Sequence, residues 1–584
     1  MIAASSPDHA ASALSVEFVL TLVAVIAAFA WPRLCSGVFS RIGRALVPLA
    51  QRRGLAVAVV GVSALLLRLA ILPIFPIPLP FVPDDFSFLL AADTFAHGRL
   101  ANPTPAMWIH FESIHITMQP TYMSMYFPAQ GLVLAAGKLL FGQPWFGLLI
   151  SSACMCAAIC WMLQAWLPAR WALLGGIIAI VHIGLFSYWI NTYHAAGCIG
   201  AAGGALILGA LPRILRKPRL RNTLPLGAGI AILGITRPYE CLLLCIPVTI
   251  ILIRWLIAGR NRPAPLQLFR LSALPLLLVI VSAAWLGYYD TRVNGSPTTL
   301  PYTINRATYA MAPYYIWQKP HPEPAYRHPA MRAYYYATEM DVYHRFHSIP
   351  GFLFGTLVKS LAAVLFFGGI AFLPLIFMLP RVLHDRRIRI LIICVAVLIA
   401  GMLIENFLVL HYLAPFTAAF YAIGLQAMRH MRLWSPGGRP VGRALVRLMV
   451  TTCLVMAALR LYSGPYHFQV NEWPPTWNVS WFGPNHFGTQ RDTVERTLEN
   501  QPGNQLAIVR YSSTHVPFDE WVYNAADIDS SKVIWAREMD PQSNLELMNH
   551  YKDRKVWLIQ PDLAQPDLIQ PDQPDPQPTP FPTR

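Results

Sequence analysis

Two adjacent carboxylates, Asp84 and Asp85, are the residues of this sequence best placed to do acid–base chemistry. They follow a proline-rich stretch, residues 73–80, that breaks an apolar run near the expected membrane surface. Partial dehydration and like-charge repulsion at such a boundary predict that at least one of the two pKa values rises toward the range of a general base. The alternative is structural, because an aspartate ahead of Phe86 and its apolar neighbours is also a good helix N-cap.

Further polar side chains follow in the same segment, before the next apolar run begins near residue 128. His110 and His115 flank Glu112 in a pattern that superficially suggests zinc, but the spacing fits no standard ligand set. Adjacent carboxylates also point apart along a helix or strand, so we expect no metal here. Solvated loop residues are the simpler account of this cluster, which comprises Asp93, His97, Arg99, His110, Glu112, His115, Tyr122 and Tyr126.

The elements that must position these residues are predicted to be membrane helices. Hydrophobic residues make up 55% of the 584 residues and charged residues only 13%, which is typical of a membrane bundle. About 20 residues of helix cross the hydrocarbon core, and the shorter runs would have to tilt or be buried by neighbours. We count twelve apolar runs, give or take two, at residues 16–32, 55–75, 145–165, 171–190, 195–212, 224–236, 241–257, 271–289, 353–379, 389–404, 407–427 and 445–462.

Basic residues concentrate in five short loops between these runs, so the net charge of +16 follows the positive-inside rule and predicts no nucleic-acid partner. If the chain crosses the membrane at each apolar run in turn, all five loops are cytoplasmic. This requires that residues 128–142 lie in the interface or re-enter the membrane without crossing it. The five loops hold residues 33–53, 213–221, 254–270, 381–387 and 429–443. The same order of crossings places four parts of the chain on the opposite, extracytoplasmic side, which we call exported: the N-terminus, residues 76–144, residues 290–352 and everything after residue 463. All nine cysteines fall in helices or on the cytoplasmic side, which excludes a disulfide framework in the exported segments.

The composition turns polar from Ser463 onward, and short β-type and helical segments alternate there. This pattern predicts a small α/β domain over residues 463–559. The last residues, 560–584, repeat Gln-Pro-Asp with almost nothing apolar and are predicted to be disordered. The expected strands are Gln505–Tyr511, Lys532–Arg537 and Lys555–Gln560, with helices at 489–500 and 542–550.

The first exported segment resembles the first exported loop of GT-C-fold glycosyltransferases. The resemblance is carried by Pro83–Leu100, by Asn102-Pro103 and by Met125–Gly131. It is closest to the branch with protein O-mannosyltransferases, the aminoarabinose transferase of lipid A and lipopolysaccharide core transferases. It covers roughly residues 55–430 and is strongest from 65 to 245.

This resemblance implies an enzyme that passes a sugar from a polyprenyl-phosphate donor to an acceptor on the exported side, with inversion. It assigns the catalytic carboxylate to Asp84, and Asp85 stands where the family commonly has Glu. A lipid-linked phosphate is already a good leaving group, so the protein needs a base and positive charge but no strong general acid. Arg237 is the expected phosphate ligand; the alternative is that Glu240 neutralises it at a helix break.

Other positions are assigned by similarity to the same family. His194 lies where related enzymes often carry an acidic residue, so it is expected either to contact substrate or to be an interfacial histidine. The pair His411-Tyr412 is similar to a His-Tyr motif near the exported mouth of related enzymes and is expected to line the donor site. The remaining candidates for contacts with substrate are His110, Glu112, Tyr126 and Glu240.

The sequence therefore predicts an all-α polytopic membrane protein, GT-C-like, with about twelve transmembrane helices. It also predicts interfacial helices in the first exported loop and a small exported α/β domain at the C-terminus. We divide the chain into an N-terminal helix with a basic loop (1–54), the transmembrane domain (55–462, with exported loops 76–144 and 290–352), the α/β domain (463–559) and the tail (560–584).

The predicted function is hexosyl or pentosyl transfer in the bacterial inner membrane, with the active site facing the periplasm. The expected partners are a lipid-linked sugar donor, a glycan, lipid or protein acceptor, and membrane lipids; no further cofactor, metal or nucleic acid is expected. No Walker sequence or nucleotide fingerprint occurs in a fitting context, which disfavours a nucleotide-sugar donor. A transporter or flippase for lipid-linked saccharides is the alternative, but its polar residues would line a path through the midplane.

Overall fold

Helices make up most of the computed structural model, which describes residues 13–259, 261–407, 409–463, 488–564 and 576–582. The first half of the chain forms α1 (Ala13–Ala30), α2 (Ser36–Ala45), α3 (Val47–Gln51), α4 (Arg53–Ala70), α5 (Pro83–Ala96), α6 (Pro128–Phe141), α7 (Trp145–Trp166), α8 (Ala169–Ala179), α9 (Tyr188–Asn191), α10 (Gly197–Arg216), α11 (Leu220–Gly234) and α12 (Pro238–Ala258). The second half forms α13 (Pro265–Asn294), α14 (Pro301–Tyr309), α15 (Pro329–Arg332), α16 (Glu339–His347), α17 (Ile349–Gly368), α18 (Leu379–Leu383), α19 (Arg389–Leu403), α20 (Thr417–Met431), α21 (Val441–Ser463), α23 (Thr489–Glu499) and α24 (Pro541–His550).

Shorter helical turns and strands complete the described elements. The turns are η1 (Trp108–His110), η2 (Ile180–Gly184), η3 (Ala333–Thr338), η4 (Ile370–Met378), η5 (Leu410–Phe416), η6 (Pro436–Gly438) and η7 (Pro561–Ala564). The strands are β1 (Ile116–Thr117), β2 (Met123–Ser124), β3 (Gln505–Val509), β4 (Val533–Arg537), β5 (Lys555–Ile559) and β6 (Thr579–Pro580).

The predicted class, a polytopic helical membrane protein, is confirmed. Among the described helices, seven are long and apolar enough to cross a membrane: α4, α7, α10, α12, α13, α17 and α21. Other apolar runs form shorter helices, such as α1 and α19. These shorter elements need packing partners or a tilt to be accommodated in lipid.

One expected apolar run, residues 353–379, does not form a single helix. Helix α17 ends at Gly368, and Gly369 adopts a positive φ of 65°, which only glycine tolerates at low cost. The chain continues as the 3₁₀ helix η4, whose Ala371 N–H donates to the buried carboxylate of Glu17 on α1 at 3.0 Å. Glu17 therefore satisfies a main-chain donor at the break, as a non-aqueous interior requires.

Helix α10 lies among α7, α11 and η5 and packs against them through small residues. A Cβ added to Gly204 would lie 1.7 Å from the main-chain oxygen of Pro415 on η5. The two backbones therefore touch at a position where no other side chain fits, as in small-residue contacts between membrane helices. This contact fixes η5 beside the loop that precedes α10.

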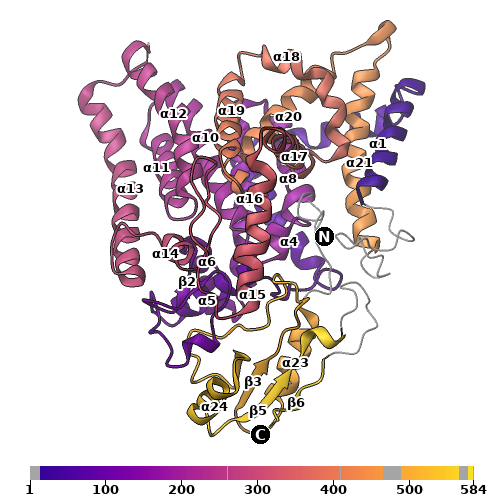
Figure 1. Ribbon diagram of the computed structural model, residues 1–584. Helices are drawn as coiled ribbons and strands as arrows, with labels where there is room; N and C mark the ends of the chain where they lie inside the picture. Colours follow the sequence, from indigo (N-terminus) through magenta and orange to yellow (C-terminus); the bar gives the residue numbers. More distant parts are fainter. Residues whose placement is uncertain (1–12, 260, 408, 464–487, 565–575, 583–584) are drawn as a thin grey trace.

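The segments predicted to be exported lie at one end of the bundle (Figure 1). Helix α5, strand β2, helices α14 and α15 and the C-terminal sheet all gather there. At the other end of the chain's first helix, Arg439 donates to Ala30 O at 3.2 Å and Arg447 on α21 donates to Pro32 O at 2.8 Å, so the C-terminal end of α1 lies beside the start of α21.

The C-terminal segment forms a four-stranded sheet with the order β4-β3-β5-β6. Strands β3, β4 and β5 are parallel, with Gln505 opposite both Val533 and Lys555, and they lie within the three segments expected to be strands. The expectation that residues 560–584 are disordered is wrong for residues 576–582. Strand β6 pairs antiparallel with β5, and Phe581 N–H donates to Val556 O at 3.1 Å, because the edge of β5 otherwise leaves main-chain groups unpaired. Residues 565–575 lie outside the described part of the chain.

Candidate active site

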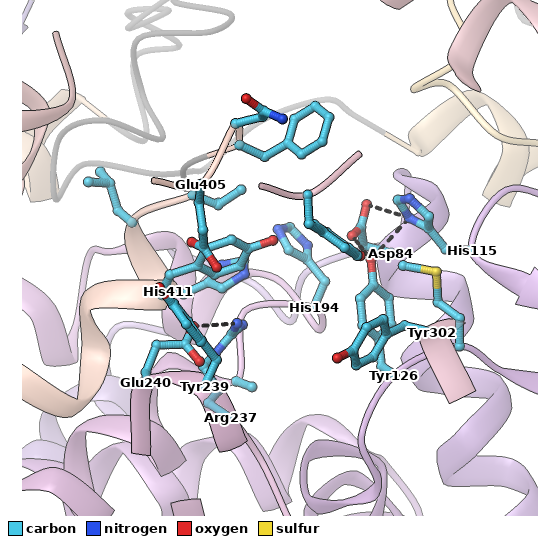
Figure 2. Close-up of a pocket in the computed structure, with 18 of the residues that line it drawn as sticks. Asp84, His115, Tyr126, His194, Arg237, Tyr239, Glu240, Tyr302, Glu405 and His411 are labelled. Carbon is cyan, nitrogen blue, oxygen red and sulfur yellow. Dashed lines mark hydrogen bonds and ion pairs between the residues drawn. The ribbon is translucent and has the colours of Figure 1, made fainter. Parts of the chain in front are cut away.

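A cavity of about 520 Å³ lies where the segment from Asp84 to Gln130 meets the start of α12, helices α14, α16 and α17, and the helical turns η3 and η5. Its walls come from parts of the chain more than 300 residues apart, as Figure 2 shows. Most of the residues singled out in the sequence line this one cavity: Asp84, Tyr126, His194, Arg237, Glu240, His411 and Tyr412.

Asp84 reaches the cavity from the first turn of α5. Helix α5 begins with Pro83, and Val82 occupies the N-cap position, so neither aspartate is the cap that the structural alternative required. The Tyr126 hydroxyl donates to Asp84 Oδ1, and His115 Nδ1 lies 3.3 Å from Asp84 Oδ2. The Asp84 side chain remains 25% exposed, so an incoming group can still reach it.

The pKa of Asp84 moves in the direction opposite to the one predicted. Burial raises it, but the charge of His115, its contact with the carboxylate, the charge of His194 and the Tyr126 hydrogen bond together outweigh burial. The net pKa is well below the usual range for aspartate. The Asp84 carboxylate is therefore ionised at neutral pH and accepts hydrogen bonds throughout the physiological range.

Asp85 turns away from the cavity and is fully buried. Its Oδ1 accepts the Tyr193 N–H at 2.8 Å and lies 2.9 Å from His194 Nδ1, while its Oδ2 accepts the Phe81 N–H at 3.4 Å. These contacts hold the loop before α10 against the start of α5. Asp85 therefore positions His194 and does not line the cavity.

His194 is buried and lies between the two halves of the site (Figure 2). Burial lowers its pKa, but the charge of Asp85 and the hydrogen bond to it outweigh that effect, so the net pKa is raised. Its ring is 6.0 Å from the ring of His411, centroid to centroid. The imidazolium form is thus favoured next to the ionised Asp84.

Arg237 lies immediately before α12, whose first residue is Pro238. Its Nη1 is 3.5 Å from Glu240 Oε1, its Nη2 donates to Ala195 O at 3.4 Å, and its guanidinium lies 4.6 Å from the centre of the Tyr412 ring. The Glu240 contact is long for a charge-assisted hydrogen bond. Arg237 Nε is buried and has no hydrogen-bond partner among the described residues. The Arg237 guanidinium therefore still has an N–H group that can donate a hydrogen bond to a ligand.

His411 and Tyr412 lie on η5 and are held by neighbouring helices. The Tyr188 hydroxyl accepts the His411 N–H at 2.9 Å and is 3.1 Å from His411 Nδ1. Tyr412 forms the aromatic surface beneath Arg237. The pair therefore forms the wall next to the guanidinium.

Two of the predicted substrate-site residues, His110 and Glu112, do not line the cavity. His110 Nδ1 lies 3.1 Å from Arg537 O in the C-terminal unit. Glu112 accepts the Tyr309 hydroxyl at 2.8 Å and the Arg327 guanidinium at 3.2 Å. Both residues connect exported segments to one another, because a buried polar group needs partners and these segments supply them.

Sequence reasoning missed much of the opposite wall. Glu405 and Lys359 line the cavity, as do several tyrosines of the second exported loop and its surroundings. The abundance of Tyr in residues 290–352 was the available signal, and Glu405 was visible as a carboxylate between two apolar runs. The tyrosines that line the cavity are Tyr126, Tyr239, Tyr302, Tyr314, Tyr315, Tyr334 and Tyr412.

Comparison with known proteins gives structural similarities at low sequence identity. No family model and no curated protein match this chain. The structure of ArnT from Cupriavidus metallidurans in the apo state has a TM-score of 0.48 and 12% identity, over 87% of this chain and 93% of that chain. The same protein bound to undecaprenyl phosphate has a TM-score of 0.46 and 11% identity, over 87% and 93%. The Archaeoglobus fulgidus oligosaccharyltransferase AglB, in complex with an inhibitory peptide and a dolichol-phosphate, has a TM-score of 0.42 and 11% identity, over 86% and 69%. ArnT and AglB are membrane glycosyltransferases of the GT-C fold.

Proposed function

We propose that this protein is an integral-membrane glycosyltransferase that moves a sugar from a polyprenyl-phosphate donor to an acceptor hydroxyl. The observation that supports this most is the composition of one cavity. An ionised carboxylate, Asp84, lies on one side, and Arg237 with spare donor capacity lies on the other. These are the two groups that transfer from a lipid-linked phosphate requires.

The proposed reaction is a single displacement at the sugar C1. The acceptor oxygen forms a bond to C1 while the bond from C1 to the phosphate oxygen breaks, and the polyprenyl phosphate leaves with the electron pair. Asp84 orients the acceptor hydroxyl and takes its proton, which becomes acidic as the new bond forms. A single displacement inverts the configuration at C1.

Positive charge stabilises the leaving phosphate in this scheme. Arg237 supplies a guanidinium, which suits phosphate geometry. His194, whose pKa is raised by its contact with Asp85, lies next to Asp84, and its cationic form adds positive charge near the reacting atoms. The protein thus provides electrostatic stabilisation at the place where charge develops.

The compartment follows from the charge pattern, and we place the cavity on the periplasmic side of a bacterial inner membrane. Basic residues in the short loops assign the opposite end of the bundle to the cytoplasm. Acceptors of the envelope, whether glycan, lipid or protein, would meet the cavity from the exported side. The cavity volume accommodates either a hexosyl or a pentosyl group.

The test replaces Asp84 with Asn in a strain that lacks the chromosomal copy of this chain. Loss of a positioned base typically costs about 10²–10⁴-fold in rate, so Asp84→Asn is expected to abolish the envelope glycan change that the wild-type chain restores. The readout is the glycan profile of the envelope by mass spectrometry, with the amount of protein in the membrane measured in parallel.

Asp341→Asn is the matched control, because this carboxylate is 62% exposed and does not line the cavity. The control is expected to restore the wild-type profile. Full restoration by Asp84→Asn at normal membrane levels would contradict the proposed role.

A further inference from the structure

The cavity contains a second carboxylate, Glu405, that the proposed reaction does not use. Figure 2 shows it on the far side of His194 from Asp84, next to His411 and Tyr239. Glu405 is only 8% exposed, and its Oε2 has no hydrogen-bond partner among the described residues. Buried carboxylates are usually paired, so an unpartnered one that lines a cavity indicates a ligand that is absent from the structure.

The backbone around Glu405 is rigidly held. Ile316 N–H donates to Ile404 O at 3.1 Å, and Asn406 N–H donates to Tyr314 O at 2.8 Å, so the second exported loop pairs with both neighbours of Glu405. The ammonium group of Lys359 donates to the main-chain oxygen of Glu405 itself. None of the ion pairs found among the described residues includes the Glu405 carboxylate. The main chain that carries this side chain is therefore held in place beside the cavity.

The electrostatic surroundings suit a ligand that donates hydrogen bonds. Burial, followed by the charge of Glu240, raises the pKa of Glu405 to about 8, while Lys359 and Arg237 partly oppose the rise. The neutral form of the Glu405 carboxyl group therefore predominates at neutral pH, and a cationic hydrogen-bond donor beside it would favour its ionised form. A second anion at this position would face both Glu405 and Glu240.

Aromatic rings surround the same part of the cavity. The rings of Tyr239 and Tyr315 are 5.6 Å apart, and those of Tyr302 and Tyr314 are 5.7 Å apart, centroid to centroid. Flat apolar faces beside a buried carboxylate suit a ring whose faces carry C–H groups and whose edge carries hydrogen-bond donors. A sugar ring has both features.

We propose that Glu405 binds hydrogen-bond donors on the ring of the transferred sugar, either hydroxyls or an ammonium group, and that the site excludes sugars that carry a carboxylate. This inference rests on the proposed function, because Arg237 would hold the donor phosphate within the same wall as Glu240 and Glu405. A uronic acid would bring a further carboxylate beside Glu240 and Glu405, where burial and the charge of Glu240 already disfavour negative charge.

The experiment measures binding of four synthetic polyprenyl phosphates to the purified full-length protein in nanodiscs. The lipid carries no sugar, a neutral hexose, an amino sugar or a uronic acid. The neutral and amino sugars are expected to increase affinity over the bare lipid, and the uronic acid is expected to decrease it. Glu405→Ala removes the proposed hydrogen-bond partner of the sugar, so it should weaken sugar-dependent binding by about tenfold or more.

Two further variants separate the possibilities. Glu405→Gln keeps the side-chain shape and removes the charge, so it should weaken binding of the amino-sugar lipid more than binding of the neutral one. Glu323→Gln, an exposed carboxylate paired with Arg332 outside the cavity, should leave all four affinities unchanged.

The outcomes distinguish this inference from the proposed function. If the bare lipid binds as tightly as the sugar-bearing lipids and Glu405→Ala changes nothing, Glu405 does not contact the sugar, while the proposed function stands. Tightest binding of the uronic acid lipid would also overturn the inference alone. If none of the four lipids binds the wild-type protein, the proposed function fails as well.

Discussion

Asp84 and Asp85 are neighbours in the chain but take part in different interactions, because one step along a helix rotates the side chain by about 100°. Asp84 faces the cavity beside His115 and Tyr126, whereas Asp85 faces the loop before α10 and binds His194. Replacing Asp85 would therefore act through the position of His194.

His194 should make stability depend on pH in a defined direction. Its pKa is raised in the folded protein, so its stabilising contribution is complete below the unfolded value of about 6.5 and is lost as pH rises through the folded pKa. We expect the melting temperature of the purified protein to fall as pH rises above about 6.5. In the His194→Gln variant, the melting temperature should fall less steeply with rising pH, because the contribution of this histidine is missing.

The measurement is a set of thermal melts across neutral and mildly alkaline pH. Glu405, with a pKa of about 8, also lowers stability as pH rises, so the difference between variant and wild type carries the information. His384→Gln, in an exposed loop, is the control. Parallel curves for wild type and His194→Gln would show that the Asp85 contact does not couple to folding.

The half of the site around Asp84 was predictable, because its residues lie within about fifty positions of one another and carry a recognisable pattern. The direction of the Asp84 pKa shift was not predictable, because it depends on His115 and His194, which come close to the Asp84 carboxylate only in the folded protein. The sequence alone also could not assign Glu405 and Lys359 to the site. Lys359 is an isolated charge inside one apolar run and Glu405 an isolated charge just after another, and only packing shows that both line a cavity.

At the scale of elements, the contact between α10 and η5 should control the geometry of the donor site. A methyl group at Gly204 would collide with the main chain of Pro415, which cannot rotate away as a side chain can. We expect Gly204→Ala to destabilise the protein by about 1–3 kcal/mol. It should also weaken lipid-phosphate binding, because η5 carries His411 and Tyr412.

Gly424→Ala on α20 is the matched control, since nothing lies within 4 Å of the added methyl group. Alanine is the better helix former by roughly 0.5–1 kcal/mol, so this variant should be neutral or slightly more stable. The two variants are compared by melting temperature and by binding of bare polyprenyl phosphate. Equal behaviour would show that α10 and η5 move independently.

Most helices could be located from the sequence, because a long apolar run is stable in lipid only as a helix that pairs its own main-chain groups. The break at Gly369 could not be predicted, because a single glycine inside an apolar run is common. The main-chain N–H of Ala371, which needs a partner after the break, is seen to be paired with Glu17 only in the structure. Strand β6 escaped detection for a related reason. Its residues, Thr579–Pro580, have no strand pattern and pair only because β5 presents an open edge.

At the scale of the whole molecule, a buried ion pair within the C-terminal unit also contacts the segment before and after the start of α5. Arg537 Nη2 lies 2.5 Å from Glu520 Oε2, and Arg537 Nε donates to Glu112 O at 2.6 Å. Glu520 N–H in turn donates to Phe81 O, just before α5, at 3.3 Å. The start of the helix that carries Asp84 is thus held partly by residues more than 400 positions away.

Removing Arg537 should therefore cost stability and transfer, although it does not line the cavity. Breaking one partner of a buried pair typically costs about 3–5 kcal/mol, so Arg537→Met should loosen the C-terminal unit and expose it to limited proteolysis. Arg510→Met removes a pair that is 44% exposed on the arginine side, and such pairs contribute about 0–1 kcal/mol. Equal protease resistance of the two variants would contradict the docking role.

The largest-scale prediction is the direction in which the cavity faces, because the proposed donor and acceptor meet only on the exported side. The test fuses alkaline phosphatase, which is active only after export, to truncated chains. Fusions after Gly98 and after Gly295 are expected to be active, since both positions lie in segments that the basic loops assign to the exported side. A fusion after Arg219, within a basic cluster, should be inactive although its protein level is similar. The inverse pattern would place Asp84 in the cytoplasm, where a nucleotide-sugar donor is available and the case for a lipid-linked one is lost.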